Sequence, residues 1–180
     1  AGGAIFVSSA NVSFNNLKFN NNKANSGGAV SVSSGPSLGK GLEIYNSEFT
    51  NNTAVDNGGA IDVSGSFIVD NGKFTANSAN SGGAISVSGS DPVFIKNSAF
   101  KDNTAKTLGG AVYSHGGTLE IHNSTFENNH AQTRGGAVAI LSNNSSTSGL
   151  DVVRIINSDF INNKADQDGG AIHVNQNSNS

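Results

Sequence analysis

The stretch FTNNTAVDNGGAI at residues 49–61 recurs along the whole chain with small changes. Its shared pattern is Phe-x-x-Asn-x-Ala, two or three further residues, and then Gly-Gly-Ala followed by Ile or Val. Copies begin at Phe19, Phe49, Phe74, Phe100, Phe126 and Phe160, and a further Gly-Gly-Ala-Ile stands at residues 2–5. Self-similarity at a period of about 20 to 50 residues indicates that one structural unit is stacked repeatedly.

Two alternating stretches in each repeat predict β-strands. Before the Phe, the pattern apolar-x-apolar-x-Asn-x-x-Phe gives LEIYNSEF at 42–49, LEIHNSTF at 119–126 and VRIINSDF at 153–160. After Gly-Gly-Ala, the alternation returns, as in Ile61-Asp62-Val63. A period of two is typical of a strand that buries one face. The apolar spacing of three and four residues that marks a helix is missing, and Gly and Asn are poor helix formers.

Each repeat thus offers three short extended segments, of which one holds the upstream alternation, one is centred on the Phe and one follows Gly-Gly-Ala. We predict an all-β fold, a single-stranded parallel β-helix or solenoid, with about six rungs of three short strands. Each strand would pair with its counterpart one rung away, about 4.8 Å along the axis. We expect residues 1–180 to form one β-helical segment, and because the chain starts within a repeat, a part of a longer array.

The most regular residues are explained by stacking on their own counterparts in neighbouring rungs. We expect an interior aromatic stack formed by Phe19, Phe49, Phe74, Phe100, Phe126 and Phe160. Asn tolerates left-handed bends and can bond other Asn along the axis, and the series that ends the first strand is Asn16, Asn46, Asn71, Asn97, Asn123 and Asn157. A second series is expected to do the same at the next bend: Asn22, Asn52, Asn77, Asn103, Asn129 and Asn163. Gly-Gly would supply backbone conformations or close approaches that other residues cannot.

Composition narrows the classes of function. The 180 residues carry a formal net charge of −3, with 10 Lys and Arg scattered among 13 Asp and Glu, so nucleic acid is not an expected partner. The chain has no Cys, which excludes disulfides and thiolate metal sites. No run of about 18 apolar residues occurs, so no membrane-spanning segment is expected in this chain. The apolar residues recur in register, which argues against disorder.

The titratable residues do not predict a catalytic site. Glu120 and Arg154 would be outward neighbours on adjacent rungs, as would Asp70 and Lys96, and ion pairs between strands explain both. The densest cluster is His115, Glu120, His122 and Arg154. A polysaccharide lyase or hydrolase needs a denser set of carboxylates, so we expect no catalytic residues.

Metal and cofactor sites are not expected either. Asp166 and Asp168 precede Gly169-Gly170, and we interpret them as a solvated loop rather than a calcium turn. The four His residues show no ligand spacing. His173 and Tyr113 would face outward from the strand after Gly-Gly-Ala, as solvent-facing or contact residues.

Glycosylation sequons and variable loops mark candidate surface positions. Asn11, Asn51, Asn143 and Asn144 are candidate N-glycosylation sites, whereas Asn123, as a member of the inward ladder, should be unavailable. The connection after the third strand varies in length, and its longest forms are residues 33–41 and 142–149. Variable loops on one edge of a repeat scaffold are the usual place for partner contacts.

The paired Gly-Gly-Ala-[Ile/Leu/Val] and Phe-x-x-Asn motifs, repeated in register from Gly2 to Val174, resemble the passenger domains of the chlamydial polymorphic outer membrane proteins. The resemblance implies a secreted, right-handed parallel β-helix, delivered to the cell surface as an autotransporter passenger and used for adhesion. The lack of Cys differs from many chlamydial passengers. Similar repeats also occur in other bacterial and algal surface proteins.

Three hypotheses of function follow. The first is a non-catalytic, extracellular or cell-surface adhesin, a rigid rod that binds a protein or glycan on a host or neighbouring cell. The second is a structural segment of an extracellular filament or cell-wall fibre, with further β-helical subunits stacked end to end, because uncapped rungs expose strand edges. The third, a polysaccharide-active β-helix enzyme, is disfavoured by the sparse carboxylates.

Overall fold

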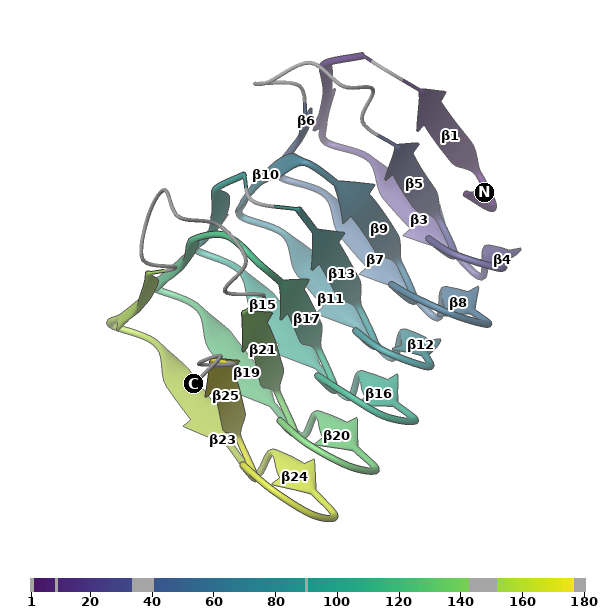
Figure 1. The fold of residues 1–180 in the computed structure, drawn as a ribbon. Helices are drawn as coiled ribbons and strands as arrows, with labels where there is room; N and C mark the ends of the chain where they lie inside the picture. Colours follow the sequence, from purple (N-terminus) through teal and green to yellow (C-terminus); the bar gives the residue numbers. More distant parts are fainter. Residues whose placement is uncertain (1, 9, 34–40, 90, 143–151, 177–180) are drawn as a thin grey trace.

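A computed structural model describes residues 2–8, 10–33, 41–89, 91–142 and 152–176. Figure 1 shows these residues winding into a coil of short strands stacked along one axis, which confirms the predicted parallel β-helix. Among the described residues there is no helix, and hence none with the length and apolarity needed to cross a membrane.

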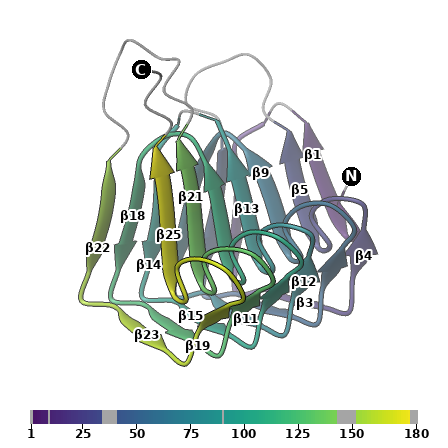
Figure 2. The same ribbon diagram turned by 60° about the horizontal axis from the view of Figure 1, so that its bottom comes forward.

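Two of the sheets are built from the alternating stretches recognised in the sequence (Figures 1 and 2). Sheet A follows Gly-Gly-Ala and has seven strands, namely β1 (Ile5–Ser8), β5 (Val30–Ser33), β9 (Ile61–Ser64), β13 (Ile85–Ser88), β17 (Val112–His115), β21 (Val138–Ser142) and β25 (Ile172–Gln176). Sheet B precedes the first Asn and has six, namely β2 (Val12–Asn15), β6 (Gly41–Tyr45), β10 (Ser66–Asp70), β14 (Val93–Lys96), β18 (Leu119–His122) and β22 (Val153–Ile156).

The other two sheets lie on either side of the second Asn. Sheet C is centred on the Phe residues, with β3 (Lys18–Asn20), β7 (Glu48–Thr50), β11 (Lys73–Thr75), β15 (Ala99–Lys101), β19 (Thr125–Glu127) and β23 (Asp159–Ile161). Sheet D has strands of only two residues: β4 (Lys23–Ala24), β8 (Thr53–Ala54), β12 (Ser78–Ala79), β16 (Thr104–Ala105), β20 (His130–Ala131) and β24 (Lys164–Ala165).

Sheet D corrects the prediction of three strands in each rung, because the structure has four. Two residues are too few to show an alternation in the sequence, so this strand left no periodic signal. Its pairing is nevertheless regular, since the Thr53 amide donates to the Asn22 carbonyl and the Ser78 amide to the Asn52 carbonyl.

The pairing register places equivalent repeat residues beside one another. Phe49 pairs with Phe74, and Phe74 with Phe100. From Phe19 to Phe160 the stacked rings have centroids 4.6–4.9 Å apart and planes within 11° of parallel. The ring spacing follows the strand spacing of a sheet. This stack and the inward residues of sheets A and B form one continuous core.

The second Asn series forms a buried ladder of side-chain hydrogen bonds. In Asn103, Oδ1 accepts from the backbone amide and from Nδ2 of Asn77, both at 3.0 Å. Its Nδ2 donates to Asn129 Oδ1 and to the Phe74 carbonyl, also at 3.0 Å. The same bonds recur from rung to rung between Asn22 and Asn163. Every polar atom of the Asn103 side chain is therefore paired inside the coil.

The left-handed bends are placed differently from the prediction for this second series. The first series bends as expected, as at Asn46 with φ 49°. At the next corner, however, the left-handed residue is the one before the ladder Asn, for example Asn51 (φ 55°) and Ala76 (φ 54°). The Asn of the second series contributes a buried, hydrogen-bonded side-chain amide. The left-handed backbone conformation belongs to the residue before it.

The first Asn series is exposed, so the expectation that Asn123 is unavailable is wrong. The buried residue at this corner is the following Ser. Ser47 Oγ accepts from the Leu17 amide at 3.1 Å and donates to the Tyr45 carbonyl at 2.7 Å. The exposed Asn side chains still bond along the axis, as Asn71 Nδ2 does to Asn46 Oδ1 at 2.8 Å.

Gly-Gly serves both purposes expected of it. Gly58 has φ +62°, a conformation that L side chains rarely adopt. At Gly59, a Cβ atom would lie 2.0 Å from the Gly83 carbonyl oxygen of the next rung. Neither position can carry a side chain at this rung spacing.

The interior Phe stack predicts a strong contrast between two Phe→Ala substitutions. Phe100 is fully buried between two rings, whereas Phe94 faces outward from sheet B and is half-buried. Phe100→Ala should lower the free energy of unfolding by about 3–5 kcal/mol, and Phe94→Ala by about 1 kcal/mol or less. Urea denaturation measures both. An unchanged midpoint for Phe100→Ala would show that the stack does not carry stability.

Candidate functional site

The inward residues are similar from rung to rung, whereas the outward residues differ. A surface that recognises a partner is therefore expected on the outside of the coil. One varied outer surface is that of sheet B, which we call the B face. Its first row is Ser13, Glu43, Ile68, Phe94, Glu120 and Arg154. Its second row is Asn15, Tyr45, Asp70, Lys96, His122 and Ile156. Both rows mix acids, cations and apolar groups, whereas the inward positions of the same strands are apolar.

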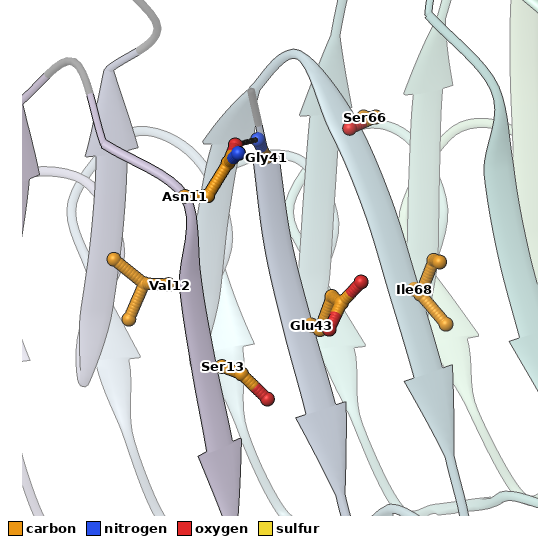
Figure 3. Close-up of a pocket in the computed structure, with 7 residues that line it drawn as sticks. All are labelled: Asn11, Val12, Ser13, Gly41, Glu43, Ser66 and Ile68. Atoms are coloured by element: carbon orange, nitrogen blue, oxygen red, sulfur yellow. Dashed lines mark hydrogen bonds between the residues drawn. The ribbon is translucent and has the colours of Figure 1, made fainter. Parts of the chain in front are cut away.

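A pocket of about 200 Å³ opens at one end of the B face (Figure 3). Figure 3 shows Asn11 beside Gly41 at its rim and the Glu43 side chain between Ser13 and Ile68. The Gly41 amide donates to Asn11 Oδ1 at 3.1 Å, which holds the rim. The lining residues come from three successive rungs: Asn11, Val12, Ser13, Gly41, Glu43, Ser66 and Ile68. The pocket thus presents one carboxylate and small polar groups beside an apolar side chain.

The centre of the B face combines an aromatic ring with a cation. Lys96 Nζ lies 5.3 Å from the centroid of the Phe94 ring, within the range of a cation–π interaction. Asp70 and Lys96 are register neighbours, as predicted. The expected ion pair is not what holds Asp70, however, because its carboxylate accepts a hydrogen bond from Asn97 Nδ2 at 2.7 Å.

The far end of the B face carries the predicted Glu120 cluster, with one exception. Arg154 is the register neighbour of Glu120, and their side chains meet at 3.3 Å. His122 Nε2 lies 3.1 Å from the other Glu120 oxygen. His115 belongs to sheet A, where it stacks with Tyr113 at a centroid distance of 6.2 Å, so it is not part of the Glu120 group. The remaining three residues form a polar network in which Glu120 contacts both Arg154 and His122.

The acids before the last Gly-Gly are also held by cations. Asp166 lies 2.7 Å from Lys164 and 3.1 Å from His130, and Asp168 pairs with Arg134 at 3.0 Å. Lys164 and His130 hold the pKa of Asp166 below its usual range. Across the part of the chain that the structure describes, no three His, Asp or Glu side chains gather as a metal site would require.

The predicted modification sites and loops are only partly described. Asn11 and Asn51 are exposed, and their glycosylation stays a prediction. Asn143, Asn144 and most of the two long connections lie outside the described residues. Both connections run from a strand of sheet A to a strand of sheet B, from β5 to β6 and from β21 to β22. They therefore join the same two sheets.

Asp62 is a perturbed carboxyl that sequence reasoning missed. It faces outward from sheet A between Ser31 and Ser86, yet burial raises the pKa of Asp62 to about 6, while a hydrogen bond with Ser86 acts in the opposite direction. Equivalent positions elsewhere hold Phe, Ser, Tyr, Ala or His. The sequence shows that Asp62 is the one acid at this position of the repeat. It does not show that Asp62 is buried, because the burial depends on the surrounding fold.

Asp62 predicts a stability that falls as the pH rises. Because the native pKa lies above the ordinary Asp value of 3.8, the native state holds its proton more tightly than the unfolded chain. Stability should therefore decline between about pH 4 and 6 and stay lower above that, by up to about 3 kcal/mol. Asp62→Asn should raise the free energy of unfolding at pH 7 and have little effect at pH 4.

Ser86→Ala provides the control of opposite sign, because it removes the hydrogen bond that favours the charged carboxylate. This variant should lose stability at pH 7 more than at pH 4. Thermal melts of the three proteins across this pH range measure the effect. A uniform loss of stability in Asp62→Asn at both pH values would contradict the assignment.

Comparison with known protein families agrees with this geometry. Residues 1–153 match the family model for the right-handed β-helix region, and residues 157–175 match the model for the Chlamydia polymorphic membrane protein repeat. The second match contains the last Phe-x-x-Asn and Gly-Gly-Ala-Ile motifs. No curated protein and no solved structure matches the chain. The chain therefore belongs to the right-handed β-helix family and carries a repeat of the Chlamydia polymorphic membrane protein type.

Proposed function

We propose that this chain is an adhesin-like, non-catalytic rod of an extracellular surface protein, comparable to an autotransporter passenger. The observation that carries the proposal is the separation of invariant inside from variable outside. Stacked Phe, Asn and Gly residues build the coil, and the B face varies in charge and apolarity from rung to rung. A surface of this kind can recognise a partner without altering the scaffold.

The family comparison supports the extracellular location. The matched repeat is that of the Chlamydia polymorphic membrane proteins. The repeats of this chain resemble those of the secreted passenger domains of such proteins. The ladders of Asn and Phe need no disulfide to form, which suits folding outside the cell. The partner would be a protein or glycan on a host or neighbouring cell.

The acids of the B face favour binding over hydrolysis. Asp70, in the second row, accepts a hydrogen bond from Asn97, and the two acids of the first row lie far apart. Glu43 and Glu120 occupy the same row three rungs apart, or about 14 Å at the strand spacing of a sheet. Paired carboxyls of glycosidases lie about 5–10 Å apart. Glu120 is also engaged by Arg154 and His122.

Binding of the purified rod to cultured host or bacterial cells tests the proposal. The double variant Glu43→Gln with Phe94→Ala changes the pocket and the centre of the B face, and should weaken binding by about tenfold or more. The control is Lys101→Gln with Thr75→Ala on the outer side of sheet C. A further variant without residues 142–149 tests the connection between β21 and β22. Equal binding by all variants would contradict recognition through this surface.

A structural fibre is the second candidate, because each rung repeats the pairing of the one before it. Strands stack in parallel register, as β9, β13 and β17 do in sheet A. A coil of this kind extends by adding rungs of the same type. Electron microscopy separates the candidates, because long fibres with an axial repeat favour the fibre and uniform short rods favour the adhesin.

A further inference from the structure

A groove of about 470 Å³ lies on the outer side of sheet D, away from the B face. Its residues come from four successive rungs. One side is a row of short polar side chains, Thr53, Ser78 and Thr104, followed by His130. Thr53 and Ser78 hydroxyls lie 3.4 Å apart. The row thus repeats a hydroxyl-bearing residue once per rung, with strands about 4.8 Å apart along the axis.

The shape of this groove follows from the shortness of sheet D. The small residues Ala54, Ala79 and Ala105 also line the groove and are almost fully buried. The longer side chains of Val55, Lys106 and Gln132, one residue beyond, line it as well, and Val55 is 65% exposed. Because its lining comes from four successive rungs, the groove runs along the coil axis.

The charge of the groove is opposite to that of the chain. No Asp or Glu lines it, whereas Lys106 does. Lys23 and Lys164 extend the hydroxyl row at its two ends, as register neighbours of Thr53 and His130. Lys164 and His130 share Asp166. The chain as a whole has a net charge of −3, so this face is a local basic surface on an acidic protein.

We propose that the groove binds a linear anionic polysaccharide laid along the coil axis. Sugar hydroxyls would exchange hydrogen bonds with Thr53, Ser78 and Thr104, and a sulfate or carboxylate group would lie at Lys106. This surface is distinct from the B face, so the inference does not depend on recognition through that face.

Two features favour a polysaccharide over other linear polyanions. No aromatic side chain other than the His130 imidazole lines the groove, whereas proteins that hold single-stranded nucleic acids stack bases on aromatic rings. The strands beneath the groove are paired within sheet D, and their amides are engaged, as that of Thr104 is by the Asn77 carbonyl. An acidic peptide therefore finds no free strand edge to extend.

Calorimetric titration of the intact chain with a size-defined heparin oligosaccharide tests the proposal. Polygalacturonate distinguishes carboxylate from sulfate recognition, while dextran and oligothymidylate serve as neutral-sugar and nucleic-acid probes. Ser78→Trp should fill the groove and abolish binding. Lys106→Gln should weaken binding about two- to fivefold. The matched charge control is Lys73→Gln on the outer side of sheet C, outside both the groove and the B face, and thermal melting of each variant checks the fold.

The expected result is binding of heparin or polygalacturonate, weakened by salt because the attraction is screened, and no binding of dextran. Amide shifts in the spectrum of the labelled protein should centre on Thr53, Ser78 and Thr104. The proposal is overturned if folded Ser78→Trp binds as the parent does, if Lys73→Gln loses as much affinity as Lys106→Gln, or if oligothymidylate binds equally well. Absence of binding to both polyanions overturns it as well.

Discussion

The buried Asn ladder is the constraint on which the rest of the coil depends. A primary amide inside a core is costly unless its donors and acceptor are paired. Here each inner ladder Asn bonds to the Asn of both adjoining rungs and to a Phe carbonyl of the preceding one. These bonds form only when successive rungs lie one strand spacing apart in the same register. A slipped rung would leave several buried polar groups unpaired.

The other regular residues act within the spacing that the ladder sets. The Phe rings stack at 4.6–4.9 Å because they rise from strands in register. The backbone of Gly59 lies close to the Gly83 carbonyl oxygen of the next rung, and a Cβ atom on Gly59 would clash with that oxygen. One interior position departs from the apolar rule, since Ser114 replaces a Val or Ile and its hydroxyl has no hydrogen-bond partner. Because the interior carries the fold, outward residues are free to change, and the B face and the groove over sheet D differ in charge for this reason.

The sequence predicted what repeats and what alternates. The parallel coil, the inward Phe stack and the outward pairing of Glu120 with Arg154 all follow from period-two patterns aligned on one motif. Three features did not follow. Sheet D has two-residue strands, which are too short for a period. Asn21 and Asn22 are identical in type, so only geometry decides which one takes the left-handed backbone and which enters the ladder. Asp62 looks like any outward acid until the surrounding residues bury it.

The outward surfaces depend on a coil that the Asn ladder stabilises. The ladder's contribution to stability is therefore the claim to test. The most direct measurement is the free energy of unfolding of Asn103→Leu by urea denaturation. Leu is apolar and of similar shape, but it leaves the Asn77 amide, its Nδ2 and the Phe74 carbonyl without their partner. We predict a loss of about 3 kcal/mol or more, since each buried unpaired group costs about 1–3 kcal/mol. Equal or greater stability of the variant would contradict the claim that the ladder fixes the coil.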